Sequence, residues 1–286
     1  MKLAPMTAAW LALAAHGAFA QEYLVTTGWL AQRLNDPNLV LLHVGGPKDY
    51  DAGHIPGARL IGVGDIAVSE DAGLKVQLPD VEALRAAFGK LGVGDASRIV
   101  IYPGQSAMQS ATRVWFTLDY LGLSERTSIL DGGLAAWQAE GRPVTKDVPE
   151  VKAAVFTARP RPDRIADASW IQSRLNDPKV QLVDARTEEF YTGATPGFQA
   201  ARPGRIPGSR SVTFSTLLEN GKFKSKEQLK AVLKGEGKQT VSYCHIGMQA
   251  TVPYFAARLA GLDVKLYDGS FEDWSRRSEL PVETGK

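Results

Sequence analysis

One residue in this chain has both the chemistry and the setting of a nucleophile. Cys244 follows an apolar run typical of a buried strand and precedes a stretch whose apolar residues have helical spacing. Gly247 allows the backbone between them to curl, so that successive N–H groups can point inward at the sulfur. Such a nest of amides stabilises negative charge, which lowers the pKa of a thiol and makes the thiolate a competent nucleophile. We therefore predict a reactive Cys244 in preference to a small buried hydrophobic side chain.

The other candidate residues surround this thiol or support it. His245 is a possible further source of positive potential, and Met248 is expected to form an apolar lip. Arg186 follows another apolar run, where it either binds an anionic substrate or forms an ion pair with Asp184 that supports a loop. The residues predicted to bind substrate are Arg186, His245, Ile246, Gly247, Met248, Gln249 and Ala250, with Asp184 in support.

The elements that must position these residues occur twice. Residues 29–37 and 170–178 share the pattern Trp-x-x-x-Arg-Leu-Asn-Asp-Pro, and further matches follow in the same order. These further matches are 54–59 with 205–210 and 131–137 with 268–274. The chain is therefore two copies of one unit. Trp137 and Trp274 end the last matched pair and are predicted core anchors.

Each copy alternates short apolar runs with amphipathic segments, which predicts a mainly parallel sheet covered by helices. The predicted strands are residues 39–44, 98–102 and 128–130 in the first copy and 180–184, 240–243 and 264–267 in the second. Helical spacing is clearest in residues 81–91 and 252–259. We predict an α/β fold with two tandem domains, residues 21–145 and 165–286, joined by a proline-rich linker at 146–164. In such sheets ligands collect where strands end and helices begin, which is where Cys244 stands.

The segment from Cys244 to Ala250 resembles the active-site loop of the rhodanese family, sulfurtransferases that carry sulfane sulfur as a cysteine persulfide. Similar features extend over nearly the whole chain after its first residues, including Ile206-Pro207-Gly208 and residues 267–270 ahead of Trp274. The resemblance implies two tandem rhodanese-like domains, of which the first is inactive and the second catalytic. Pro103 stands in the first copy where the second has Cys244, while His43 and Gly45 replace Asp184 and Arg186.

The resemblance also implies a reaction. Cys244 would take sulfur from thiosulfate or a similar donor and pass it to a thiophilic acceptor such as cyanide, a thiol or a protein thiol, without a cofactor. The loop has neither the basic residues typical of thiosulfate enzymes nor the Cys-Gly-Ser-Gly pattern of mercaptopyruvate enzymes. His245 and the export signal in residues 1–20 favour thiosulfate or another inorganic sulfane over mercaptopyruvate. Some members carry another arginine where this chain has residues 188–191. Three arginines either compensate for it or are solvated loop charges: Arg202, Arg205 and Arg210.

Three other functions share parts of the pattern, and the sequence argues against two of them. A cysteine phosphatase needs an arginine six positions after its cysteine, where this chain has Ala250, so phosphatase chemistry is not expected. An exported solute-binding protein would exchange strands between its lobes, whereas this repeat runs head to tail. A sulfur-relay or redox-sensing module, which passes its sulfur only to a dedicated protein partner, stays open as the alternative to a freely turning-over enzyme.

The charge composition bears on the partners of the protein, and residues 1–20 bear on its location in the cell. The 286 residues include 33 Lys plus Arg against 31 Asp plus Glu, which indicates no nucleic acid or anionic membrane partner. The four histidines and one cysteine have no metal-binding spacing, so no metal is expected. Residues 1–20 are typical of a signal peptide cleaved after Ala20, which predicts a soluble periplasmic product; an uncleaved anchor is the alternative.

Overall fold

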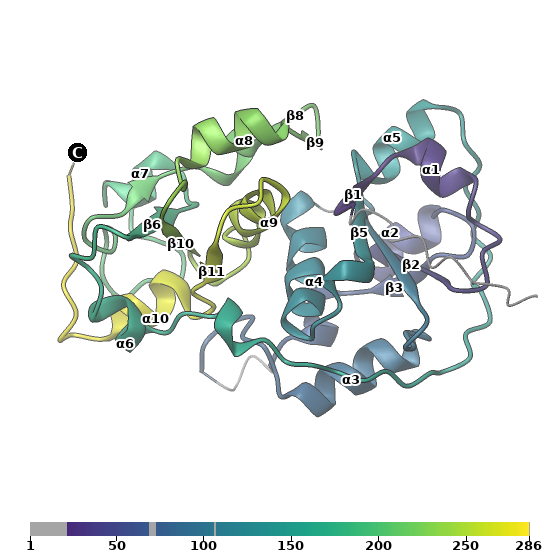
Figure 1. Cartoon of the computed structure of the whole chain (residues 1–286), viewed down its shortest axis with the longest axis horizontal. Helices are drawn as coiled ribbons and strands as arrows, with labels where there is room; N and C mark the ends of the chain where they lie inside the picture. Colours follow the sequence, from purple (N-terminus) through teal and green to yellow (C-terminus); the bar gives the residue numbers. More distant parts are fainter. Residues whose placement is uncertain (1–21, 69–72, 106, 286) are drawn as a thin grey trace, which may run out of the picture.

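The fold repeats one α/β unit, as the computed structural model of residues 22–68, 73–105 and 107–285 shows (Figure 1). The predicted signal peptide lies outside these described residues. In the first domain a five-stranded parallel sheet has the order β1-β5-β4-β2-β3. Its strands are β1 (Leu24–Val25), β2 (Leu39–Val44), β3 (Arg59–Ile61), β4 (Arg98–Pro103) and β5 (Thr127–Leu130). Its helices are α1 (Thr27–Ala31), α2 (Pro47–Ala52), α3 (Val81–Lys90), α4 (Met108–Tyr120) and α5 (Gly133–Ala139).

The second domain has the same topology with one strand fewer. Its four-stranded parallel sheet has the order β11-β10-β6-β7. Its strands are β6 (Val180–Asp184), β7 (Arg210–Ser211), β10 (Gln239–Tyr243) and β11 (Val264–Leu266), and β8 (Leu218–Glu219) with β9 (Lys222–Phe223) forms a separate hairpin. Its helices are α6 (Ala168–Gln172), α7 (Glu188–Tyr191), α8 (Lys226–Leu233), α9 (Thr251–Leu259) and α10 (Ser270–Arg276). The prediction of two tandem α/β units with parallel sheets is confirmed.

The two matched tryptophans make the same hydrogen bond in their domains. The indole N–H of Trp137 donates to the carbonyl of Pro143, and that of Trp274 donates to the carbonyl of Pro281, both at 2.8 Å. Both tryptophans are buried, so the prediction that they are core anchors is confirmed. Where β1 pairs with β5 in the first domain, a single parallel bridge between Ile165 and Leu266 takes its place in the second.

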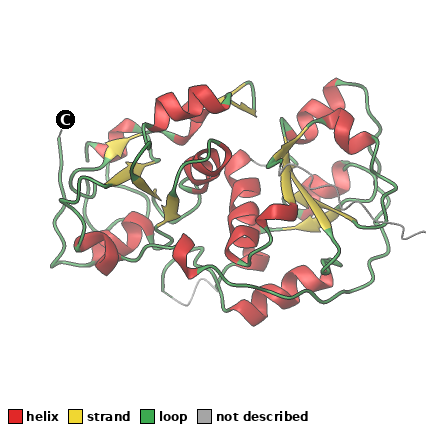
Figure 2. Cartoon of the chain, in the orientation of Figure 1, coloured by secondary structure: helices red, strands yellow, loops and turns green. Residues whose placement is uncertain are grey.

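The two domains meet through α4 and α9, which lie side by side between the sheets (Figures 1 and 2). Trp115 of α4 meets Phe255 of α9 edge to face, with ring centroids 4.8 Å apart. Phe116 and Tyr254 make a similar contact at 5.0 Å. One continuous hydrophobic cluster therefore joins the facing sides of both domains, because aromatic side chains bury large apolar surfaces.

The segment predicted to be a linker is held against the first domain. Residues 146–161 form neither helix nor strand, yet the amide of Ala154 donates to the carbonyl of Gly89 and that of Arg159 to the carbonyl of Leu121. Phe156 is buried in the domain core. Backbone pairing of this kind fixes the path of a chain that lacks regular structure of its own.

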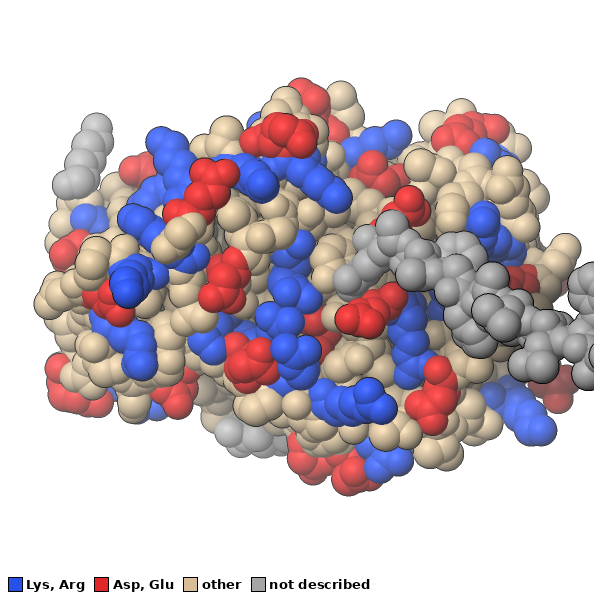
Figure 3. All heavy atoms as spheres, in the orientation of Figure 1, with Lys and Arg blue, Asp and Glu red and all other residues tan. Residues whose placement is uncertain are grey.

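Charges of both signs are interspersed over the face shown in Figure 3. Among the described residues, every helix is too short or too polar to cross a membrane. The same part of the chain contains no group of three or more His, Cys, Asp or Glu side chains that could hold a metal ion.

Candidate active site

Cys244 lies at the carboxyl edge of the second sheet. It follows β10, which is flanked by β6 and β11, and the loop that starts with it ends where α9 begins at Thr251. The side chain is fully buried in the fold, but it lines a cavity of about 400 Å³. The residues around this cavity are Gln109, Phe198, Cys244, His245, Ile246, Met248 and Gln249. The predicted nucleophile is thus enclosed by protein on most sides and faces a space large enough for a small molecule.

The loop after Cys244 leaves a run of amides unused. The backbone N–H groups of residues 245–250 donate to no acceptor in the described chain, and Cys244 Sγ is not an acceptor for them. The next amides, of Thr251 and Val252, donate to the carbonyls of Met248 and Gln249. Gly247 has φ +82°, a left-handed conformation that favours glycine. This turn at the start of a helix therefore has several amides that the described fold does not use and that are available to an anionic ligand.

The amide of Cys244 itself has a partner. It donates to Ser270 Oγ at 3.1 Å, and that hydroxyl donates to the carbonyl of Tyr267 at 2.9 Å. Ser270 has φ +51°, which is strained for a residue with a side chain. The matched residue of the first domain is Gly133, with φ +59°. The sequence signal for Ser270 is a serine where the first copy has Gly133, and the sequence alone did not predict Ser270 as part of the site.

Asp184 and Arg186 form a buried ion pair beneath the site. Arg186 Nη2 lies 2.6 Å from Asp184 Oδ2, its Nε donates to both carboxylate oxygens, and Nη2 also donates to the carbonyl of Gly204. The guanidinium stacks on Phe271 at 4.3 Å from the ring centroid. Only Nη1 has no partner among the described residues. Of the two predicted roles, the ion pair with Asp184 is present. Arg186 does not line the cavity, so nothing observed tests its binding of substrate, and that role stays a prediction.

Two loop residues predicted to bind substrate also lie outside the cavity lining. Gly247 faces Asp268, because a Cβ built on it would come within 2.6 Å of the Asp268 carbonyl oxygen. Ala250 is buried, and its carbonyl accepts from Ser242 Oγ at 2.8 Å. These two residues can therefore contribute backbone amides and the shape of the turn, and Ile246, Met248 and Gln249 form the wall.

His245 carries no charge at neutral pH. Burial, reinforced by the positive charge of Arg186, lowers the pKa of His245 to about 4. Its ring packs edge to face on Phe190, with centroids 4.7 Å apart, and its Nδ1 has no partner within the described chain. The expectation that His245 adds positive potential is therefore wrong, because desolvation outweighs the nearby carboxylates.

The three arginines proposed to compensate for a missing cation are used in the scaffold. Arg202 donates to the carbonyls of Ser275, Arg277 and Leu280, as the C-terminal segment folds around it. Arg205 pairs with Glu283, and Arg210 donates to the carbonyl of Leu233. None of the three lines the cavity, so both sequence interpretations of them are wrong.

Two cavity residues come from parts of the chain that the sequence did not connect to Cys244. Gln109 belongs to α4 of the first domain, and Phe198 lies on the loop after α7, with 58% of its surface exposed. Gln109 Oε1 and Gln249 Oε1 are both buried without a partner in the described chain. No cationic side chain lines the cavity, so backbone amides and neutral side chains surround any ligand there.

The equivalent position in the first domain has different chemistry. Pro103 ends β4 where Cys244 follows β10, and the neighbouring strand carries His43 in place of Asp184. His43 Nε2 lies 3.2 Å from Asp49 Oδ2, and its Nδ1 lies 3.2 Å from the Tyr102 hydroxyl. The space is filled, because a Cβ on Gly104 would lie 2.3 Å from His43 Nε2.

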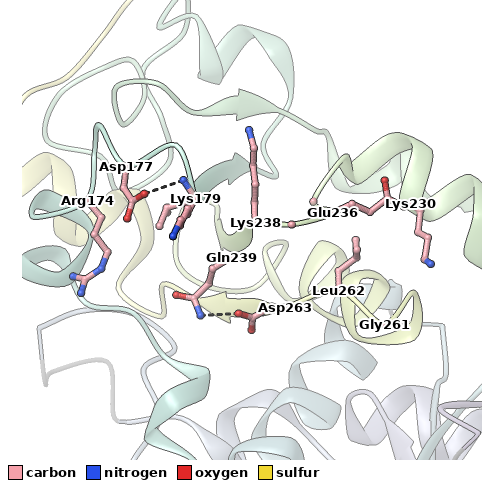
Figure 4. Close-up of a pocket in the computed structure, with 13 residues that line it drawn as sticks. Arg174, Asp177, Lys179, Lys230, Glu236, Lys238, Gln239, Gly261, Leu262 and Asp263 are labelled. Carbon is pink, nitrogen blue, oxygen red and sulfur yellow. Dashed lines mark hydrogen bonds between the residues drawn. The ribbon is translucent and has the colours of Figure 1, made fainter.

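A second hollow of about 540 Å³ lies at the opposite edge of the second sheet (Figure 4). It surrounds the amino ends of β6, β10 and β11, whereas Cys244 follows the carboxyl end of β10. Its charged residues are mixed, and Gln239 at its centre donates to Asp263 at 2.8 Å. None of the predicted site residues lines it, so the rule that ligands bind at carboxyl ends favours the Cys244 cavity.

Comparison with known proteins agrees with the repeat. The model of the rhodanese-like domain matches residues 26–140 and 167–277. The 3-mercaptopyruvate sulfurtransferase of Escherichia coli K12 is 31% identical, over 92% of this chain and 99% of its own length. The thiosulfate sulfurtransferase of Rattus norvegicus is also 31% identical, over 92% of this chain and 96% of its own. In fold, the anaerobic ergothioneine biosynthesis enzyme from Chlorobium limicola is similar, with a TM-score of 0.83, 24% identity, and 92% and 70% coverage of the two chains.

Proposed function

The chain belongs to the rhodanese family, and from that premise we propose that it transfers sulfane sulfur through a persulfide on Cys244. Its relatives support sulfur transfer in general, and the feature that carries the finer proposal is the buried Cys244 thiol beside a run of unused loop amides. Each half of the proposed reaction uses one part of this arrangement.

In the first half-reaction the Cys244 thiolate attacks the outer sulfur of thiosulfate. A sulfur–sulfur bond forms on the enzyme, the bond within thiosulfate breaks, and its electron pair leaves with sulfite. The product is a cysteine persulfide whose negative charge lies on the outer sulfur. The free amides of residues 245–250 supply donors for that sulfur, and they need no reorganisation because they are unused before the reaction.

In the second half-reaction an acceptor removes the outer sulfur. Cyanide attacks it, the persulfide bond breaks, and thiocyanate leaves while the electron pair returns to Cys244 as thiolate. A small thiol or a protein thiol would attack the same atom. The cavity of about 400 Å³ suits small acceptors or a narrow side chain, because Cys244 is fully buried at its wall.

Thiosulfate is the donor we propose, and 3-mercaptopyruvate is the competing donor. One relative of each kind has the same identity to this chain, so identity does not decide between them. The loop His245-Ile246-Gly247-Met248 lacks both the Cys-Gly-Ser-Gly pattern of mercaptopyruvate enzymes and the basic residues typical of thiosulfate enzymes, so the support for thiosulfate is the export predicted from residues 1–20. Turnover of both donors by the same preparation, compared as kcat/KM, tests this choice.

Intact mass measurement after incubation with thiosulfate tests the persulfide. We expect one added sulfur on the wild-type protein and none on Cys244→Ser, together with loss of thiocyanate formation in that variant. Retained turnover in Cys244→Ser would refute the assignment. If the persulfide forms but neither cyanide nor small thiols remove it, the sulfur-relay alternative replaces the enzyme.

We further propose that the protein acts in the periplasm. The support is the composition of residues 1–20, an apolar stretch after Lys2 that ends in Ala18-Phe19-Ala20. Fractionation of cells producing the full chain, with N-terminal sequencing of the product, tests both the location and cleavage after Ala20.

A further inference from the structure

We propose that Arg113, a residue of the first domain, is a positioning residue for the Cys244 loop of the second domain. The inference depends on the role proposed above for Cys244. Arg113 belongs to α4, is fully buried and directs its guanidinium across the domain interface. Its Nη1 donates to Asp268 Oδ1 at 2.5 Å and to the carbonyl of Gly247 at 3.3 Å, while Nη2 donates to the carbonyl of Val76 at 2.5 Å. One side chain thus joins the first domain to the middle of the sulfur-binding loop.

Asp268 lies between the first domain and the turn at Gly247 and contacts both. A Cβ on Gly247 would lie 2.6 Å from the Asp268 carbonyl oxygen and 3.1 Å from its Oδ1, so no free space separates the two residues. The amide of Leu78 donates to Asp268 Oδ2, and Gln77 Nε2 donates to the Asp268 carbonyl, both at 2.9 Å. Three residues of the first domain therefore hold Asp268, which closes one side of the turn.

The bond to the Gly247 carbonyl also fixes an amide. A trans peptide places its N–H opposite its C=O, so a carbonyl held toward Arg113 directs the N–H of Met248 away from it. That N–H is one of the unused donors of the loop, and Met248 lines the cavity. A second contact supports the end of the loop, because Thr112 Oγ1 lies 2.7 Å from Thr251 Oγ1 at the start of α9. The inactive domain thus orders the donors that would hold the persulfide.

The rate of alkylation of Cys244 by iodoacetamide, measured as a function of pH, tests the inference in the full chain. Arg113→Met removes every donor and keeps the length of the side chain, whereas Arg113→Lys keeps the charge. We expect Arg113→Met to slow alkylation of Cys244 at pH 7 by about tenfold or more, because the loop amides that would stabilise the thiolate are no longer held in place. Arg113→Lys should restore part of the loss, and it supplies the comparison if the methionine variant does not fold.

Arg258→Met is the matched control. Arg258 lies at the end of α9 far from the loop, and its Nε pairs with Asp119 of α4 at 3.4 Å across the same interface. We expect this variant to weaken the interface without changing alkylation of Cys244. Wild-type alkylation in both Arg113 variants, or equal slowing in Arg258→Met, would overturn the inference. Because alkylation needs no sulfur donor, normal alkylation in a protein that does not transfer sulfur would count against the proposed function alone.

Discussion

At the scale of single residues, burial decides what the polar side chains of the site can do. His245 stands next to Cys244, the proposed nucleophile, yet the lowered pKa leaves it neutral at pH 7, so it forms part of an uncharged wall with Phe190 and Phe198. Arg186 keeps its charge because Asp184 lies beside it in the same buried environment. The anion binding that we propose for this site therefore relies on backbone amides, because no Lys or Arg among the described residues lines the cavity.

The pKa of His245 predicts a specific pH dependence of stability. In the unfolded chain the imidazole has its ordinary pKa of 6.5, and in the folded chain the pKa is about 4. Between these values the unfolded state binds more protons, so the free energy of unfolding falls as the pH is lowered through this window. We expect wild type to lose on the order of 3 kcal/mol more than His245→Gln between pH 7 and pH 4.

Urea denaturation of both proteins at several pH values measures this difference. The comparison with His245→Gln is necessary because burial also lowers the pKa of His43, which is common to both proteins and cancels. Parallel curves for the two proteins over this pH range would show that His245 is not buried as described.

At the scale of elements, the turn between β11 and α10 matches the turn between β5 and α5 in the first domain. The two turns differ at Ser270, where the first domain has Gly133. Ser270 and Gly133 share a left-handed backbone, but only Ser270 has a hydroxyl that accepts from the amide of Cys244. The strain of a side chain at this position costs roughly 1 kcal/mol. We therefore expect the Ser270 hydroxyl to have a functional role, which would explain a strained residue in the copy that contains Cys244.

Two substitutions at this position separate strain from function. Ser270→Gly relieves the strain and loses the hydroxyl, so we expect nearly unchanged stability but reduced turnover. Ser270→Ala keeps the strain and leaves the Cys244 amide without a partner, which should cost about 1–2 kcal/mol and reduce turnover as well. Urea denaturation and thiocyanate formation measure the two effects. Full turnover in Ser270→Gly would show that the hydroxyl does not position Cys244.

The elements also show how far the sequence predicts the structure. Residues 39–44 and 180–184 are strands with the predicted bounds, because short, mainly apolar runs with β-branched residues favour buried strands. The two-residue strand β1 has no periodicity of its own and forms only by pairing with β5. The position of Cys244 follows from the strand, loop and helix order, whereas Gln109 and Phe198 come from a distant helix and an irregular loop, where local patterns carry no information about the contact.

At the scale of the whole molecule, the two copies share one hydrophobic cluster, so we expect them to unfold cooperatively. The hydrophobic cluster that contains Cys244 continues through α9 and α4 into the core of the first domain. Polar contacts accompany it, because buried Asp119 of α4 accepts from the Tyr254 hydroxyl at 2.6 Å. An interface of this kind resembles a domain interior more than a contact between independent units. The first domain therefore contributes to the site without containing a nucleophile of its own.

Calorimetric unfolding tests this cooperativity through Phe255, which is fully buried in α9 and contacts Trp115 of α4 and Phe223 of β9. We expect wild type to unfold in a single transition. Phe255→Ala leaves a cavity at the interface and should cost about 3–5 kcal/mol, lowering the midpoint of that one transition by about 10 °C. Phe88→Ala, a matched deletion in α3 of the first domain, should also move the whole transition. If the two domains share one core, neither can lose stability alone. A transition that splits in two, with one component at the wild-type temperature, would therefore indicate that each domain unfolds independently.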